Sequence, residues 1–173
     1  MVCTQDGVVY VADYGVRCVR AIHGGHVTTV ARFAGPTALA LDHDGHLIVA
    51  DSADNRIYKV TLPGGEVSTI AGSGECGTDD GMAMEASFAE PAGVAVDGEG
   101  NIIVVDCGSS RIRKIINPSA GTMARVTTLA GSEEGFADGP GATALFMTPN
   151  GVVVSLDGSI LVADMAVHKI RRI

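Results

Sequence analysis

Four aspartates stand at the ends of similar apolar runs and are the first residues in this sequence that could do chemistry. They are Asp13, Asp51, Asp106 and Asp164, each closing a run such as "IVAD" or "IVVD". Carboxylates can act as general acids or bases, but the same acid recurs in all four copies, which favours a structural role over catalysis. Two of them precede an arginine by five residues across a short turn, where the two groups could pair and hold a hairpin closed. The expected ion pairs are Asp51 with Arg56 and Asp106 with Arg111.

Two glycine-rich stretches, "AGSGECGTDDGMAMEASFAEPAG" (71–93) and "AGSEEGFADGPGATALFMTPNG" (130–151), hold a second group of acids. The candidate binding residues among them are Glu75, Asp79, Asp80, Glu85, Glu133, Glu134 and Asp138. Acidic loops on a rigid scaffold favour recognition of a basic or polar partner, and the alternative is that they only keep the loops hydrated. The "GTDDG" segment lacks the spaced oxygen ligands of a dedicated calcium loop.

Histidines and cysteines are the other residues with metal or nucleophile chemistry. His23 and His26 flank one tight turn, and His43 and His46 flank another, so the two pairs are weak candidates for a shared metal. Solvated turn histidines are the interpretation that we prefer. Four cysteines without a C-x-x-C spacing indicate reduced thiols, and the chain has neither a G-x-S-x-G nor a phosphate-binding glycine motif. We expect no metal and no cofactor.

Charge and hydropathy restrict the kinds of partner that the chain could bind. The formal net charge of -8 disfavours nucleic-acid binding, which depends on a positive field. No segment approaches the roughly 18 apolar residues of a membrane helix, and the first ten residues lack the basic start and apolar run of a secretory signal. The sequence therefore predicts no membrane association and a cytoplasmic location.

An internal repeat positions all of these groups. The four aspartates are separated by 38, 55 and 58 residues, and each is followed nine residues later by an aliphatic residue. Each unit contains up to four short apolar segments, as in "PAGVAVD", "IIVVD", "RIRKI" and "VTTLAG", separated by turn sequences such as "GEGN" and "CGSS". The unequal spacing comes from the connection that follows the fourth segment. This pattern predicts four antiparallel strands per unit, with insertions confined to one kind of loop.

The second segments predict how the units pack. They are apolar at consecutive positions, as in "LIVA" (47–50), whereas a strand covered on one face would alternate with polar residues. Each small sheet is therefore expected to lie between two neighbours. Four-stranded sheets stacked face to face around an axis form an all-β fold, the β-propeller.

Two of the units resemble the NHL repeat. "PAGVAVDGEGNIIVVDCGSSRIRKI" (91–115) and "PTALALDHDGHLIVADSADNRIYKV" (36–60) share its proline start, its turn glycine, its "I-x-V-A-D" strand and its "N-R-I-x-K" strand. The first and fourth units depart at the arginine position, where Cys18 and Lys169 stand. The resemblance implies an NHL-type propeller, commonly of six blades, with the motif aspartate and arginine in structural roles. The long inserts resemble a type also found next to thioredoxin-like domains.

The blade boundaries follow from the repeat, within a single module of residues 1–173. We expect blades at about 1–35, 36–90, 91–148 and 149–173, the last without its outer strand. About four blades would leave apolar sheet faces uncovered, which predicts an incomplete, open propeller or a fragment of a six-bladed one. Self-association through the open blade edges is a second expected interaction.

The sequence predicts a non-enzymatic scaffold that binds a protein partner through the face carrying the long loops. Two alternatives remain open on the resemblance. One is a metal-dependent lyase or hydrolase, such as a lactonase or an amidating lyase, that uses the axial channel. The other is an RNA-binding NHL domain, which the net charge disfavours.

Overall fold

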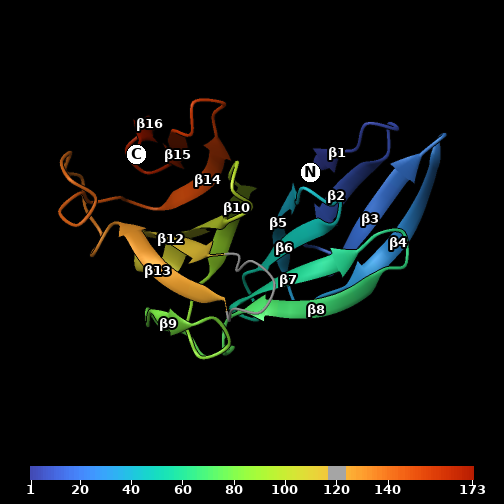
Figure 1. Ribbon diagram of the computed structural model, residues 1–173, viewed down its shortest axis with the longest axis horizontal. Coiled ribbons are helices and arrows are strands. Elements are labelled where there is room, and N and C mark those ends of the chain that lie inside the picture. Colours follow the sequence, from blue (N-terminus) through green and yellow to red (C-terminus); the bar gives the residue numbers. More distant parts are fainter. Residues whose placement is uncertain (117–123) are drawn as a thin grey trace.

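Four small antiparallel sheets make up the computed structural model, which describes residues 1–116 and 124–173 (Figure 1). Blade 1 contains β1 (Val2–Cys3), β2 (Val9–Asp13), β3 (Cys18–His23) and β4 (His26–Arg32). Blade 2 contains β5 (Pro36–Leu41), β6 (Leu47–Asp51), β7 (Arg56–Thr61) and β8 (Glu66–Ala71). Blade 3 contains β10 (Pro91–Val96), β11 (Ile102–Asp106), β12 (Arg111–Ile116) and β13 (Arg125–Ala130), with the short β9 (Gly81–Met82) added beside β13. Blade 4 contains β14 (Pro149–Val154), β15 (Ile160–Asp164) and β16 (Lys169–Arg172).

The blades follow one another in chain order, with blades 1 and 4 at the two ends of the series (Figure 1). The first or second strand of each blade contacts the first strand of the next, in the order β2 with β5, β5 with β10, and β10 with β14. Within the described residues the only other regular element is a turn of 3-10 helix at Cys107–Ser109. The predicted all-β propeller architecture is confirmed.

Alternate residues of the second strands supply two different cores. Ile102 and Val104 of β11 join a cluster with Ile48 and Ala50 of β6, whereas Ile103 and Val105 pack with residues of blade 4. Every residue of β6 and of β11 is buried. Because successive side chains of a strand point to opposite faces, burial along the whole strand requires a sheet on each side. This explains the uninterrupted apolar runs in the sequence.

The turn between the first two strands of blade 3 is held by one carboxylate. Asp97 accepts hydrogen bonds from the backbone N–H groups of Glu99 and Asn101, and its Oδ2 lies 3.0 Å from Lys114 Nζ. Burial acts to raise the pKa of Asp97, but the hydrogen bonds from Asn101 and Lys114 outweigh it, so the pKa is lowered below its usual value.

Asp97→Asn is expected to remove a pH-dependent part of the stability. A carboxyl whose pKa is lowered by folding stabilises the protein above its unfolded pKa, and this contribution is lost as the pH falls through the folded value. The difference in Tm between wild type and variant should therefore be largest near about pH 7 and shrink towards about pH 3. Thermal unfolding across this range measures it, with the exposed Asp44→Asn as the control. A difference that stays constant with pH would contradict the expectation.

Candidate functional site

One end of the propeller gathers the longest connections and is called the loop face below. In blades 2, 3 and 4, the connection that precedes the first strand contacts the turn between the second and third strands of the same blade. Ser52 N donates to Gly35 O at 3.0 Å, and Gly108 N donates to Ala89 O at 2.9 Å. The same contact joins Met165 N to Thr148 O at 3.2 Å in blade 4. Both types of loop therefore emerge on one face, as the strand order predicts.

Two long connections dominate the loop face. Insert A (residues 72–90) joins blades 2 and 3, and insert B (residues 131–148) joins blades 3 and 4. Each folds back on itself through an isolated parallel bridge, Cys76 with Phe88 in insert A and Glu134 with Phe146 in insert B. The two phenylalanine side chains are buried in the scaffold. Both inserts thus have a defined shape.

A fully buried arginine from β12 fixes insert A. Arg113 lies over the ring of Phe88, and its Nη2 donates to Asp80 Oδ1 at 2.7 Å and to the carbonyl of Asp79 at 2.9 Å. Its Nη1 donates to the carbonyl of Ser87 and, at 3.2 Å, to the carboxylate of Asp106. A planar guanidinium with several fixed donors suits such a node better than a lysine would.

Insert B is fixed in the same way, with every position moved by 58 residues. Arg171 of β16 donates to Asp138 at 2.7 Å, to Asp164 at 3.0 Å and to the carbonyls of Ala137 and Leu145. Its guanidinium also lies 5.0 Å from the centre of the Phe146 ring. Each insert is therefore attached to the third strand of the blade that follows it.

The expected pairs Asp51–Arg56 and Asp106–Arg111 are wrong. Arg56 instead pairs with Asp54 at 2.8 Å and donates to the carbonyl of Ser73, and Asp106 pairs with Arg113. The predicted partners do stand opposite each other in the strand register. However, the carboxylates turn towards the loop face, where Asp51 accepts the N–H groups of Ala34 and Gly35 and Asp106 accepts that of Ala89.

The arginine that pairs with the motif aspartate in blades 3 and 4 lies seven residues after that aspartate, and the sequence contains a pattern that indicates this position. This position holds Arg113 and Arg171 in the blades that follow a long insert. Blade 2 follows a short connection, and there the position holds Tyr58, whose ring packs 5.5 Å from that of Phe33. In blade 1 the position holds Arg20, which lies 3.4 Å from Asp13 and whose Nε is buried with no partner within the described residues. In blades 2 to 4, the sequence thus has an arginine at this position where a long insert precedes the blade and a tyrosine where a short connection does.

The structure divides the seven acids predicted for binding into two groups. Asp80 and Asp138 are engaged by the buried arginines, and the carboxylate of Asp79 accepts a hydrogen bond from Ser87 Oγ. The remaining four side chains are exposed on the inserts: Glu75, Glu85, Glu133 and Glu134. The first group maintains the inserts, and the second is available to a partner.

Both inserts meet at one acidic hollow of about 460 Å³. Glu90 comes from insert A, Glu133 and Glu134 come from insert B, and the turn at 107–110 lies between them. Burial raises the pKa of the Cys107 thiol, and the carboxylates of Glu90 and Asp106 raise it further. This environment keeps the thiol protonated and therefore unsuited to act as a nucleophile. The hollow is instead suited to a positively charged group.

The histidine pairs lie at the opposite end of the blades. His23 and His26 face each other at the tip of the β3–β4 hairpin, His43 is exposed in its turn, and His46 Nδ1 accepts the backbone N–H of Leu62 at 3.0 Å. In the part of the chain that the structure describes, no group of three or more histidine, cysteine or acidic residues is arranged to hold a metal. In the same part, no helix is long and apolar enough to cross a membrane.

Small antiparallel sheets that stack on one another, with recurring aspartates, arginines and variable loops, define a β-propeller. The NHL repeat matches residues 88–115 of this chain, so the resemblance seen in the sequence is confirmed and the chain is a β-propeller that carries an NHL repeat. The chloroplastic protein SUPPRESSOR OF QUENCHING 1 of Arabidopsis thaliana is 35% identical over 80 residues, which are 46% of this chain and 8% of that protein. The chain thus spans less than a tenth of this relative.

Solved propellers share the fold over almost the whole chain. A Bacteroides thetaiotaomicron protein of unknown function has a TM-score of 0.81 at 26% identity, covering 94% of this chain and 43% of its own. A streptogramin B lyase has a TM-score of 0.66 at 18% identity, covering 96% of this chain and 47% of its own. At this identity the lyase supports the fold alone.

Proposed function

We propose that this NHL module is a protein-binding scaffold whose loop face recognises a basic segment of a partner. The observation that carries the proposal is the acidic hollow, to which both inserts contribute carboxylates. Glu90, Glu133 and Glu134 belong to two separate connections, yet the fold brings them to one place beside the turn at 107–110. A lysine or arginine side chain entering the hollow would meet negative charge from two sides.

Attachment of the inserts to the core supports recognition. Arg113 and Arg171 fix each insert before any partner arrives, so little ordering is left to do on binding. Loops held by a rigid scaffold are the usual location of recognition surfaces in repeat proteins. The exposed glutamates also add a long-range field that speeds the approach of a basic partner.

Charge reversal on the loop face tests the proposal. The double variant Glu133→Lys/Glu134→Lys reverses the carboxylates of insert B and leaves the structural Asp80 and Asp138 in place. We expect proteins captured by the immobilised wild-type chain from a cell extract, quantified by mass spectrometry, to include a set that falls at least about tenfold with this variant. Capture of that set should also weaken as salt is raised.

A matched control reverses charge at the other end of the blades. Asp44 and Glu66 are exposed there, and the double variant Asp44→Lys/Glu66→Lys makes the same change in net charge. It should retain the set lost by the loop-face variant. Equal partner lists for the two variants would reject the loop face as the binding surface.

A further inference from the structure

Arg111, the first residue of β12, lines a hollow of about 460 Å³ beside the outer strand of blade 3. The walls come from residues 78–80 of insert A, residues 128–130 of β13, and Gly131 and Ala142 of insert B. Insert A is held on this side by Arg113, which binds Asp80 at 2.7 Å. The hollow therefore has a fixed shape and contains one arginine.

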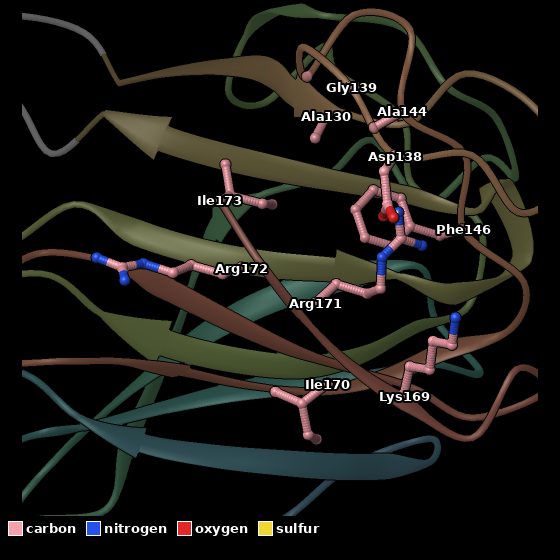
Figure 2. A pocket seen from close by; sticks show the side chains of 11 residues that line it. Ala130, Asp138, Gly139, Ala144, Phe146, Lys169, Ile170, Arg171, Arg172 and Ile173 are labelled. Atoms are coloured by element: carbon pink, nitrogen blue, oxygen red, sulfur yellow. The ribbon is translucent and has the colours of Figure 1, made fainter.

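The basic residue at this motif position is engaged in blades 2 and 4. Arg56 of blade 2 pairs with Asp54 at 2.8 Å, and its Nη2 donates to the carbonyl of Ser73. In blade 4 the position holds Lys169, which Figure 2 shows on β16 and whose Nζ lies 4.1 Å from the centre of the Phe136 ring. Each of these cations has a partner within its own part of the fold.

Arg111 has no ion pair, hydrogen bond or ring contact within the part of the chain that the structure describes. One cause is the residue two positions before it. Ser109 stands where blade 2 has Asp54, and its hydroxyl donates to Asp106 instead. The carboxylate that neutralises Arg56 thus has no counterpart beside Arg111.

The second cause is the length of the insert that follows the blade. A Cβ added at Gly74 would lie 2.5 Å from Arg56 Nη2, so the backbone of insert A passes directly over that guanidinium. Insert B is one residue shorter, and Glu133 follows Ser132 where insert A has Gly74. Arg111 is therefore left half-buried at the wall of the hollow, with its donors free for a ligand.

The charges around the hollow favour a carboxylate as that ligand. A guanidinium presents planar donors that match the two oxygens of a carboxylate. Asp80 is already engaged by Arg113 and by the N–H of Thr128, so its charge is compensated. The carboxylate of Asp79 accepts a hydrogen bond from Ser87 Oγ but has no ion pair among the described residues. Its negative charge repels a doubly charged phosphate more strongly than a singly charged carboxylate.

This hollow adjoins the acidic hollow of the loop face. Ser110 lines the acidic hollow and the next residue, Arg111, lines this one, while insert B contributes Glu133 to the first and Gly131 to the second. We propose that the hollow at Arg111 binds the carboxylate of an acidic residue, in the same partner segment whose basic residue enters the acidic hollow. This site rests on the proposed function and deepens it, because the partner then carries both charges a few residues apart.

Sodium acetate is the probe for the carboxylate site in the intact chain. We expect the NMR signal of the Arg111 Nε–H group, assigned by its loss in Arg111→Lys, to shift with half-saturation below about 100 mM. The signal of the paired Arg56 should stay in place. Sodium sulfate should bind more weakly than acetate, and Asp79→Asn should remove this preference. An Arg111 shift no larger than that caused by sodium chloride, or tighter binding of sulfate than of acetate, would overturn the site.

Charge reversal at Arg111 tests the shared partner. Capture of the proteins lost with Glu133→Lys/Glu134→Lys should also fall at least about tenfold with Arg111→Glu. Arg125→Glu makes the same change in net charge on an exposed residue, at the end of β13 away from the loop face, and should retain these proteins. A set that the double variant loses and Arg111→Glu retains would overturn the role of Arg111 and leave the proposed function standing. Retention of every protein by both variants would overturn the proposed function and the shared partner together.

Discussion

Arg113→Met is expected to lower the free energy of unfolding by about 3–5 kcal/mol, because it breaks a buried ion pair by removing one partner. The guanidinium is fully buried and pairs with Asp106, whose side chain is also fully buried. Removing it leaves that carboxylate without its counter-charge and removes the donors to three acceptors of insert A, namely Asp80 and the carbonyls of Asp79 and Ser87. For a chain of this size the corresponding fall in Tm is on the order of 10 °C.

Urea unfolding followed by circular dichroism measures this loss, and Arg111→Met supplies a matched control. Arg111 begins the same strand two residues earlier and is partly exposed, so its replacement should cost less than about 1 kcal/mol. Arg113→Lys keeps the charge but not the planar set of donors, and it should fall between the two. Similar losses for Arg111→Met and Arg113→Met would show that the node does not hold insert A.

Limited proteolysis of Arg113→Met distinguishes loosening of insert A from unfolding of the whole chain. Insert A should be cleaved in Arg113→Met at temperatures where the blades remain folded, because its contacts to β12 are lost. Insert B, which is fixed by Arg171, should resist cleavage in the same variant. Cleavage of both inserts at the same rate would point to general unfolding.

The strands could be predicted from the sequence because their signals are local. Consecutive apolar residues in 102–105, bounded by "GEGN" and "CGSS", specify both the strand and its burial on two faces. The sequence predicts the first strand of blade 3 at 91–97, and the structure has it at Pro91–Val96. Repetition of the pattern then implies the stacking, since each exposed sheet face needs an identical neighbour.

The ion pairs could not be predicted in the same way, because spacing gives register but not the direction of a side chain. Asp106 stands opposite Arg111, as expected, yet its carboxylate is drawn to the N–H of Ala89 in the preceding connection. Arg113 lies on the same face of the strand two residues on and reaches both Asp106 and insert A. Whether Asp106 pairs with Arg111 or with Arg113 depends on how the 19 residues of insert A fold, and no local sequence pattern specifies that.

The short strand β9 escapes prediction for a related reason. Gly81–Met82 has no apolar alternation and no flanking turn signal of its own. It pairs with β13 because Asp80, the preceding residue, is bound by Arg113 and by Thr128. Its conformation is therefore a consequence of tertiary contacts, as is the hollow in which the glutamates of both inserts meet.

Gly131→Ala is expected to lower the free energy of unfolding by about 3 kcal/mol or more, through two separable causes. Gly131 has a φ of +88°, which costs an alanine about 1–2 kcal/mol. In addition, a Cβ at this position would lie 2.3 Å from the carbonyl oxygen of Ser110 and 3.0 Å from Arg111 Cα. Both are backbone atoms of the turn and strand that carry Arg113, so the clash cannot be relieved by rotating a side chain.

Gly158→Ala separates the two causes. Gly158 has nearly the same φ, +84°, but no atom of the described residues lies within 4 Å of its Cβ position, so only the conformational cost should appear. Thermal and urea unfolding of both variants give the difference, which measures the close approach between insert B and the β11–β12 turn. Since Gly131 N also donates to Gly141 O at 3.1 Å, a shift of the backbone to relieve the clash would loosen insert B. If both variants lose the same free energy of unfolding, the β11–β12 turn moves without cost to make room for the new Cβ. The start of insert B would then not be fixed against blade 3.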